Sequence, residues 1–300
     1  MPHRQPPRTF DLWGAPFDGG STLGWPGSRY APGRIRDALR WVTQRIEDGA
    51  IYSLETGSIH EVGTDLLRDR GDIDVVGHDI DATIDACSTA VAGSLRDGRV
   101  PIVMGGDDSL LFPCARGVHE VLTGRIGVIH FDAHLDLLDH NRFQGRVSQS
   151  SGMRRSLELD RVDPDDCIQV AVRHFNFPSS AEFKRKTGLT HLTAREFQAL
   201  GPAGAVEQIL DRVSGADHLF LSFDIDAIDP AFAPGAGAHE PGGLTSGEAL
   251  EAVRLLAPHC DALAVTEVNP LTDDATATTA TLAAYLLFHF AVFGSGGARR

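Results

Sequence analysis

The sequence has few cysteines and fewer basic than acidic residues, and both features narrow the classes of function to consider. Its four cysteines are widely spaced and form no Cys-x-x-Cys pair, so we expect reduced thiols in a cytoplasmic protein. Lys and Arg number 27 against 41 Asp and Glu, which gives a formal charge of −14. Nucleic acids and anionic membranes bind clustered positive charge, so neither is an expected partner. A small substrate fits this charge better, and a negatively charged protein is compatible with a cationic one.

Long hydrophobic runs and linker-like segments are missing as well. The opening stretch MPHRQPPRTF lacks the apolar core of a signal peptide, and the apolar run LAAYLLFHFAVF is too short to span a bilayer. Nothing in the composition marks a linker between two halves of the chain. We therefore expect residues 1–300 to form a single domain without a membrane span.

Short apolar segments alternate with segments of helical periodicity along the whole chain. This alternation predicts an α/β fold in which a parallel sheet is covered by helices on both faces. In such sheets the ligand site lies beyond the carboxyl ends of the strands. The expected strands lie near residues 10–14, 60–62, 100–104, 126–131, 168–172, 190–192, 218–223 and 263–266, and the expected helices span 32–46, 80–95, 110–122, 203–213, 246–256 and 278–293.

Acidic residues follow three of these strands directly. In RIGVIHFDAHLD, Asp132, His134 and Asp136 occupy alternate positions, which point to one side of an extended chain. The other two segments are IVMGGDDS, which carries Asp107 and Asp108, and LFLSFDIDAIDP, which carries Asp224, Asp226 and Asp229. Carboxylates and imidazoles gathered in this way are ligands that divalent cations require.

Each acidic residue also has a structural interpretation. An Asp after a strand commonly caps the next helix or closes a turn, and for Asp107, Asp108 or Asp229 taken singly we favour that interpretation. Together, however, several carboxylates at one sheet edge would repel one another unless cations lay among them. Six side chains are too many for one open catalytic site and suit two ions about 3.5–4 Å apart that activate a shared hydroxide. The six candidate ligands are Asp108, Asp132, His134, Asp136, Asp224 and Asp226.

These motifs resemble those of the ureohydrolase family, which includes arginases and agmatinases, and the similarity covers nearly the whole chain. The family motifs GGDHS, DAHxD and SxDxDxxDP correspond here to GGDDS, DAHLD and SFDIDAIDP. WGAPFDGG, PGSRYAPGRIRDAL, DPAFAPGAGAHEPGGLT and VTEVNP resemble further family segments, the third of them in its agmatinase-like form. The resemblance implies a three-layer α/β/α fold with about eight parallel strands, a binuclear manganese centre and a homo-oligomer, either a trimer or a hexamer.

The resemblance also implies a role for each matched residue. Asp132 and Asp224 would bridge the two ions, with Asp108 and Asp136 completing one site and His134 and Asp226 completing the other. Asp136 would also orient the nucleophile. Glu267 would hold the planar cation of the substrate by a bidentate pair, although a Glu at this position could instead pair with an Arg of a neighbouring helix.

Three positions depart from the family pattern. Asp108 replaces a histidine ligand, which makes the centre one charge unit more negative, favours Mn²⁺ over Zn²⁺ and predicts an alkaline pH optimum. Gln149 stands where the family has a histidine that shuttles a proton to the leaving amine, and glutamine does not titrate. His140 and His239 are the candidate replacements by sequence position. Ala238 and His239 replace Thr and Pro in the loop that contacts the substrate.

The predicted activity is therefore metal-dependent hydrolysis of a guanidino compound, agmatine-like or a guanidino acid, to an amine and urea. Two alternatives remain open. The same centre could release formamide from a formimino compound, or the changes at Asp108 and Gln149 could mark a non-catalytic paralogue that binds a ligand or scaffolds an oligomer.

Overall fold

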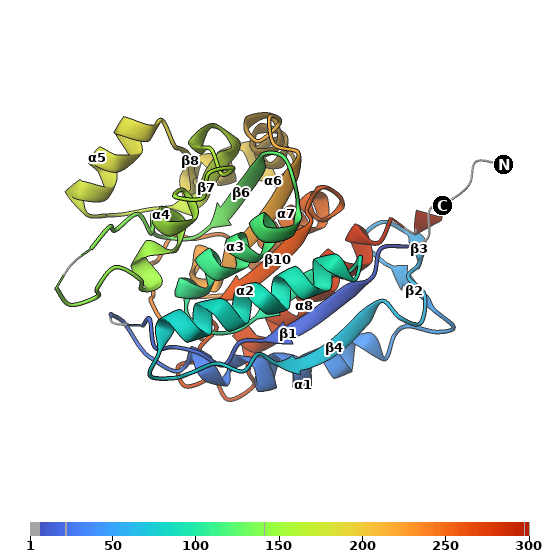
Figure 1. The fold of residues 1–300 in the computed structure, drawn as a ribbon. Helices are drawn as coiled ribbons and strands as arrows, with labels where there is room; N and C mark the ends of the chain where they lie inside the picture. Colours follow the sequence, from blue (N-terminus) through green and yellow to red (C-terminus); the bar gives the residue numbers. More distant parts are fainter. Residues whose placement is uncertain (1–6, 22, 141, 297, 300) are drawn as a thin grey trace.

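A parallel sheet of eight strands forms the centre of the molecule. The computed structural model describes residues 7–21, 23–140, 142–296 and 298–299. The strand order is β4-β1-β5-β10-β9-β6-β7-β8, and every neighbouring pair is parallel (Figure 1). The strands are β1 (Phe10–Gly14), β4 (Leu67–Asp72), β5 (Val100–Met104), β6 (Ile126–Phe131), β7 (Cys167–Val172), β8 (Thr190–Thr193), β9 (His218–Asp224) and β10 (Ala262–Thr266).

Helices cover both faces of this sheet and complete the predicted three-layer α/β/α architecture. One apolar cluster joins the sheet to α1 (Ala31–Thr43), α6 (Ala194–Arg212), α7 (Ser246–Leu256) and α8 (Thr278–Gly294). A second cluster joins the opposite face to α2 (Ile80–Arg96) and α3 (Leu111–Val121), which lie in front of the sheet in Figure 1. Strands β5, β6 and β10 are buried at every position, because both of their faces are covered. No helix among the described residues has the length and apolarity that a membrane span needs.

The sequence misidentified one strand of the main sheet and missed two helices. The segment predicted near residues 60–62 belongs instead to a small antiparallel sheet made of β2 (Ala50–Ser53), β3 (Ser58–Glu61) and β11 (Ala298–Arg299). The edge position of the main sheet is taken by β4, whose sequence LRDRGD is largely charged and exposed. Edge strands tolerate charge, so an apolar pattern could not reveal β4. The short α4 (Gly152–Ser156) and the polar α5 (Pro178–Thr187) were also missed. The helix predicted over residues 203–213 is the second part of α6, which Gly201 interrupts with φ +69°, and the first part, capped by Thr193, was missed.

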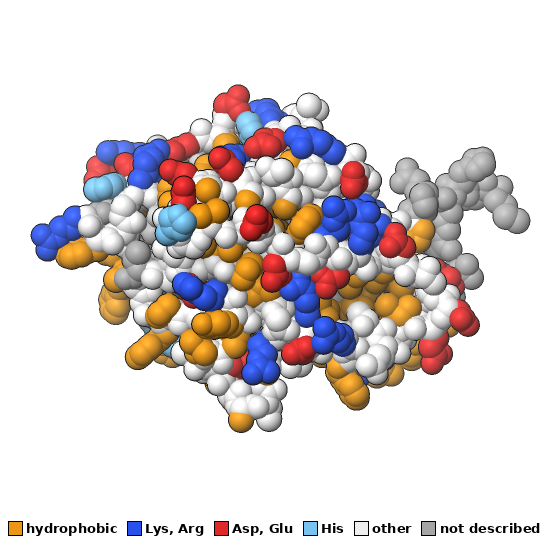
Figure 2. Space-filling model, turned by 60° about the horizontal axis from the view of Figure 1, so that its bottom comes forward, with side chains coloured by type: hydrophobic (Ala, Val, Ile, Leu, Met, Phe, Trp, Pro, Cys, Tyr) orange, Lys and Arg blue, Asp and Glu red, His pale blue; other side chains and the backbone are white. Residues whose placement is uncertain are grey.

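Positive and negative side chains are interspersed on the face that Figure 2 shows, and apolar side chains lie between them. Several arginines are also neutralised by neighbouring acids. Arg36, for example, contacts both Asp69 and Asp72. On this face the positive charges are therefore not gathered into a continuous basic surface.

Candidate metal and substrate site

Four neighbouring strands deliver the candidate site residues to one edge of the sheet. In the order β5-β10-β9-β6, the segments that follow these strands carry Asp108, Glu267, Asp226 and Asp132. Asp108, Glu267 and Asp226 line one cavity of about 340 Å³. The predicted convergence of distant acidic motifs is therefore present in the fold.

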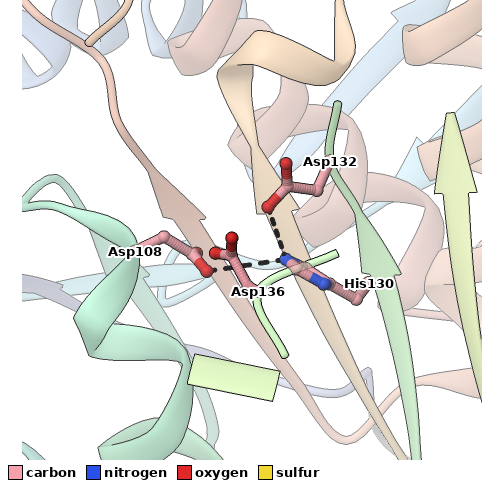
Figure 3. A group of neighbouring side chains, drawn as sticks. All are labelled: Asp108, His130, Asp132 and Asp136. Atoms are coloured by element: carbon pink, nitrogen blue, oxygen red, sulfur yellow. Dashed lines mark ion pairs between the residues drawn. The ribbon is translucent and has the colours of Figure 1, made fainter. Parts of the chain in front are cut away.

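The first group of potential ligands is Asp108, His130, Asp132 and Asp136, all of them buried (Figure 3). The Nε2 atom of His130 lies 3.0 Å from Asp132 Oδ2 and 3.5 Å from Asp108 Oδ2. Sequence reasoning missed His130, because it stands inside the apolar run of β6. The signal was nevertheless present. His130 precedes Asp132 by two residues, so the two side chains share one side of the strand.

The second group is Asp132, His134 and Asp226. His134 Nδ1 lies 3.2 Å from Asp132 Oδ1 and 3.1 Å from Asp226 Oδ2. The other ring nitrogen, Nε2, lies 3.7 Å from Oε1 of Glu240, a residue that the sequence did not indicate. Asp132 belongs to both groups, which is the position expected of a carboxylate shared by two ions. Asp224 lines the cavity but stands outside both groups.

The unpaired atoms of the first group fit a cation. Asp108 Oδ2, Asp132 Oδ2 and both ring nitrogens of His130 are buried without a well-formed hydrogen bond from any described residue. Buried polar atoms are rarely left so, because each lost hydrogen bond costs about 1–3 kcal/mol. Two ligands bound at right angles by bonds of about 2.1 Å would lie about 3.0 Å apart, as His130 Nε2 and Asp132 Oδ2 do. The donor set is oxygen-rich with one imidazole in each group, which suits a hard to borderline divalent cation.

The pKa values of the site residues also favour a bound cation. Burial raises the pKa of Asp108, Asp136 and Asp224, and the negative charge of Asp132 raises all three further. Burial alone would lower the pKa of His130, but Asp132 and Asp108 raise it to about 10. A cation placed among these carboxylates would remove the repulsion that raises their pKa values.

Several hydrogen bonds fix the carboxylates in place. Thr266 Oγ1 donates to Asp108 Oδ1 at 2.7 Å, and the Ala133 N–H donates to Asp226 Oδ1 at 3.0 Å. Asp224 Oδ1 accepts from the Asp226 N–H at 2.8 Å. Each acid therefore keeps one oxygen tied to the protein. The sequence contained Thr266 within VTEVNP but offered no signal for its contact with Asp108.

Glu267 is held with its carboxylate in the same cavity. Its Oε1 accepts from the Asp108 N–H at 2.9 Å, and burial, followed by the charge of Asp107, raises its pKa. The backbone of Glu267 has φ +60°, and that of Asp136 has φ +46°. Such left-handed conformations are costly for residues other than glycine and concentrate at functional sites. Glu267 is not paired with a helix arginine, which was the alternative interpretation of this residue.

Four residues that the sequence placed near the substrate differ in their position relative to the cavity. Gln149 and Ala238 line the cavity, and Gln149 Nε2 donates to the Leu23 carbonyl at 2.8 Å. This bond leaves Gln149 Oε1 buried and unpaired. His239 does not line the cavity, because its Nε2 lies 2.7 Å from the Pro234 carbonyl instead. His140 is exposed and is also absent from the cavity wall.

Comparison with known proteins agrees with this geometry. The sequence profile of the Arginase family matches residues 8–292. Proclavaminate amidinohydrolase of Streptomyces clavuligerus is 34% identical, covering 97% of this chain and 91% of that protein. Guanidinobutyrase of Pseudomonas aeruginosa is 30% identical, and the match covers 100% of this chain and 92% of that protein. The crystal structure of formimidoylglutamase from Bacillus subtilis superposes with a TM-score of 0.83 at 30% identity, covering 96% and 87%.

Proposed function

Because the chain belongs to the arginase family and is accordingly a metal-dependent amidinohydrolase, we propose that it hydrolyses the linear C–N bond of a guanidino compound to an amine and urea. The observation that carries this proposal is the buried Glu267 carboxylate, which shares one cavity with Asp108 and Asp226 from the two ligand groups. A planar guanidinium matches a carboxylate by two parallel hydrogen bonds.

The metal centre is assigned to two ions. We assign one ion to Asp108, His130, Asp132 and Asp136 and the other to Asp132, His134 and Asp226. Asp224 lines the same cavity and keeps the bridging role that the family resemblance implied. Mn²⁺ is the expected metal, since oxygen-rich donor sets favour hard cations. When bound, two such ions would lower the pKa of water toward neutrality and stabilise negative charge on the oxygen that attacks the central carbon.

Glu267 orients the guanidinium group of the substrate. Its carboxylate binds the guanidinium and turns the central carbon toward the ligand groups, so that the reaction proceeds from a fixed geometry. The Asp108 N–H and the left-handed backbone hold this side chain before substrate arrives. Five acidic side chains in the cavity wall, Asp108, Asp136, Asp224, Asp226 and Glu267, also attract a cation electrostatically.

Asp136 transfers a proton in this reaction, and Gln149 positions the nitrogen that leaves. Asp136 accepts a proton from the attacking water as the C–O bond forms and gives it to the nitrogen that carries the tail, whose C–N bond then breaks. The remaining hydroxyl proton passes to the released amine, so that the products are urea and an alkylammonium ion. Gln149 does not titrate, but its unpaired Oε1 accepts a hydrogen bond from a substrate N–H. Glutamine thus positions the leaving nitrogen without supplying the proton.

The test is a screen of guanidino compounds against protein loaded with Mn²⁺, with urea, formamide and bound metal all measured. Urea and one equivalent of amine support the proposal. Formamide from formimino compounds would support that alternative instead. Two tightly bound ions with no product from any compound would contradict catalysis and favour a ligand-binding paralogue. The oligomeric state and a cytoplasmic location stay predictions, and light scattering of the purified protein would test the first.

A further inference from the structure

The cavity has a chemically distinct outer part. Its floor is formed by the segments after β5, β6, β9 and β10, whereas parts of its wall come from the segments after β1 and β7. In the sheet order, β1 and β7 flank those four strands on opposite sides. A substrate whose guanidinium meets Glu267 would therefore direct its tail between Leu23 of one segment and Phe175, Phe177 and Pro178 of the other.

This outer wall carries no charge among the described residues. All charged groups that line the cavity belong to the floor, and no Lys or Arg lines it at all. The nearby basic side chains have other partners. Arg173 donates to the carbonyls of Asp226 and Glu240, Arg154 stacks on Phe183, and Arg142 stacks on Phe143. Since no described Lys or Arg lines the cavity, a carboxylate at the end of a tail would have no counter-ion in the wall, and an ammonium group would have none away from the floor.

Apolar side chains at the mouth of the cavity are exposed. Phe175 is 94% exposed, Leu23 51% and Phe177 44%. The polar groups that accompany them, Asn176 and Ser180, are neutral. Exposed apolar side chains gathered beside a polar floor are typical of a binding groove.

We infer that the substrate is a guanidino compound with an uncharged, mainly hydrocarbon tail, bound between Leu23 and Phe175 to Pro178. This inference rests on the proposed function and refines its substrate class, in place of the agmatine-like or guanidino-acid tails that the sequence favoured. Each methylene buried against this wall should tighten binding about fourfold. A charged tail end should weaken binding at least about tenfold, because it loses water without gaining a partner.

Pairs of compounds with equal shape provide the test. Pentylguanidine differs from agmatine by a methyl group in place of the terminal ammonium, and (4-methylpentyl)guanidine differs from 4-guanidinobutyrate by an isopropyl group in place of the carboxylate. With the Mn²⁺-loaded protein, we expect kcat/KM for urea release to be at least about tenfold higher for the uncharged member of each pair, mainly through KM. Equal or higher values for the charged members would overturn the inference.

Binding separates this inference from the proposed reaction. Calorimetry with the same four compounds ranks their affinities even if none is hydrolysed, and a preference for the uncharged members with no urea formed would support the tail site and contradict the reaction. Tight binding of a charged member would contradict the tail site alone.

A charge-introducing variant gives a second readout. Phe175→Lys should raise kcat/KM for 4-guanidinobutyrate at least about fivefold and lower it for (4-methylpentyl)guanidine, because the new ammonium faces the tail. Phe232→Lys is the matched control, since Phe232 is also exposed but lies outside the cavity wall. Light scattering of both variants shows whether Phe175 instead contacts a second copy of the chain. A dissociated oligomer with unchanged substrate preference would overturn the inference.

Discussion

His130 Nε2 lies 3.0 Å from Asp132 Oδ2, and neither atom has a well-formed hydrogen bond within the described structure. The contact arises because β6 places residues two apart on one side of the sheet. The two atoms can pair with each other when His130 is protonated, and their spacing equally matches two neighbouring ligands of one cation. In the proposed assignment, His130 would supply an imidazole to the site in which Asp108 occupies the family's histidine position.

Loss of this imidazole should weaken one of the two metal sites. We expect His130→Asn to lower the affinity for the ion of the Asp108–His130–Asp132–Asp136 group at least about 10- to 100-fold. The group with His134 should retain its ion. Mass-spectrometric metal analysis after dialysis against graded Mn²⁺ measures the change. His140→Asn changes an exposed histidine outside the cavity and should retain two ions. Unchanged binding in His130→Asn would remove His130 from the ligand set.

Replacement of the shared carboxylate should have a larger effect. Asp132 belongs to both ligand groups, so we expect Asp132→Asn to empty both sites and abolish hydrolysis, whereas circular dichroism shows a native fold. Asp224→Asn should act similarly if Asp224 also bridges. Retention of one tightly bound ion by Asp132→Asn would show that Asp132 serves a single site.

The charge of Glu267 can be tested with its hydrogen bond preserved. Glu267→Gln keeps an oxygen that accepts from the Asp108 N–H but removes the negative charge that faces the guanidinium. Hydrogen bonds to charged groups contribute about 1.5–3 kcal/mol, so kcat/KM should fall about 10- to 150-fold. Metal content should stay at the wild-type level. If kcat/KM were unchanged, Glu267 would not bind the substrate cation.

Gly237 packs closely against Glu267, so a larger residue at position 237 should disturb substrate binding. A Cβ at Gly237 would overlap Glu267 Oε2, so Gly237→Ala must displace this carboxylate. We expect kcat/KM to fall at least about tenfold in steady-state urea assays with little change in bound metal. Gly247→Ala on α7 meets no atom within 4 Å and serves as the control. Wild-type activity in Gly237→Ala would mean that the carboxylate can move without consequence.

The metal-free protein should become less stable as pH rises. Burial raises the pKa of Asp108, Asp136, Asp224 and Glu267, and it raises that of Asp107 to about 7. An acid whose pKa is higher in the folded state than in the unfolded state stabilises the fold at low pH and loses that contribution as pH rises. The pKa of His130 is raised to about 10 despite burial, so the stability that its charged form contributes is also lost as pH rises.

Thermal unfolding from about pH 5 to about pH 9 measures this dependence. The Tm of the metal-free protein should fall across the range, and saturating Mn²⁺ should make the curve flatter. A Tm that rises with pH in the metal-free protein would contradict the raised pKa values.

Much of the site could be predicted from local patterns. Alternate spacing in DAHLD selected Asp132, His134 and Asp136, and each of them belongs to a ligand group, but the segment bends at Ala133 and His134 instead of being extended. The apolar runs before the three acidic motifs located β5, β6 and β9 to within a residue. His130 was missed because it stands inside the apolar run of β6, although its two-residue spacing from Asp132 was a usable signal. The edge strand β4 was missed because its charged sequence lacks the apolar signal of a buried strand.

The sequence by itself determined which ligand types were available and which of them share one side of a strand, because the two-residue period of a strand is a local property. Only the tertiary structure decided that β5, β10, β9 and β6 are neighbours. It also decided that His130 faces Asp108 and that His239 turns away toward Pro234. These relationships depend on contacts between segments far apart in the chain, and packing across the sheet selects them where local periodicity cannot.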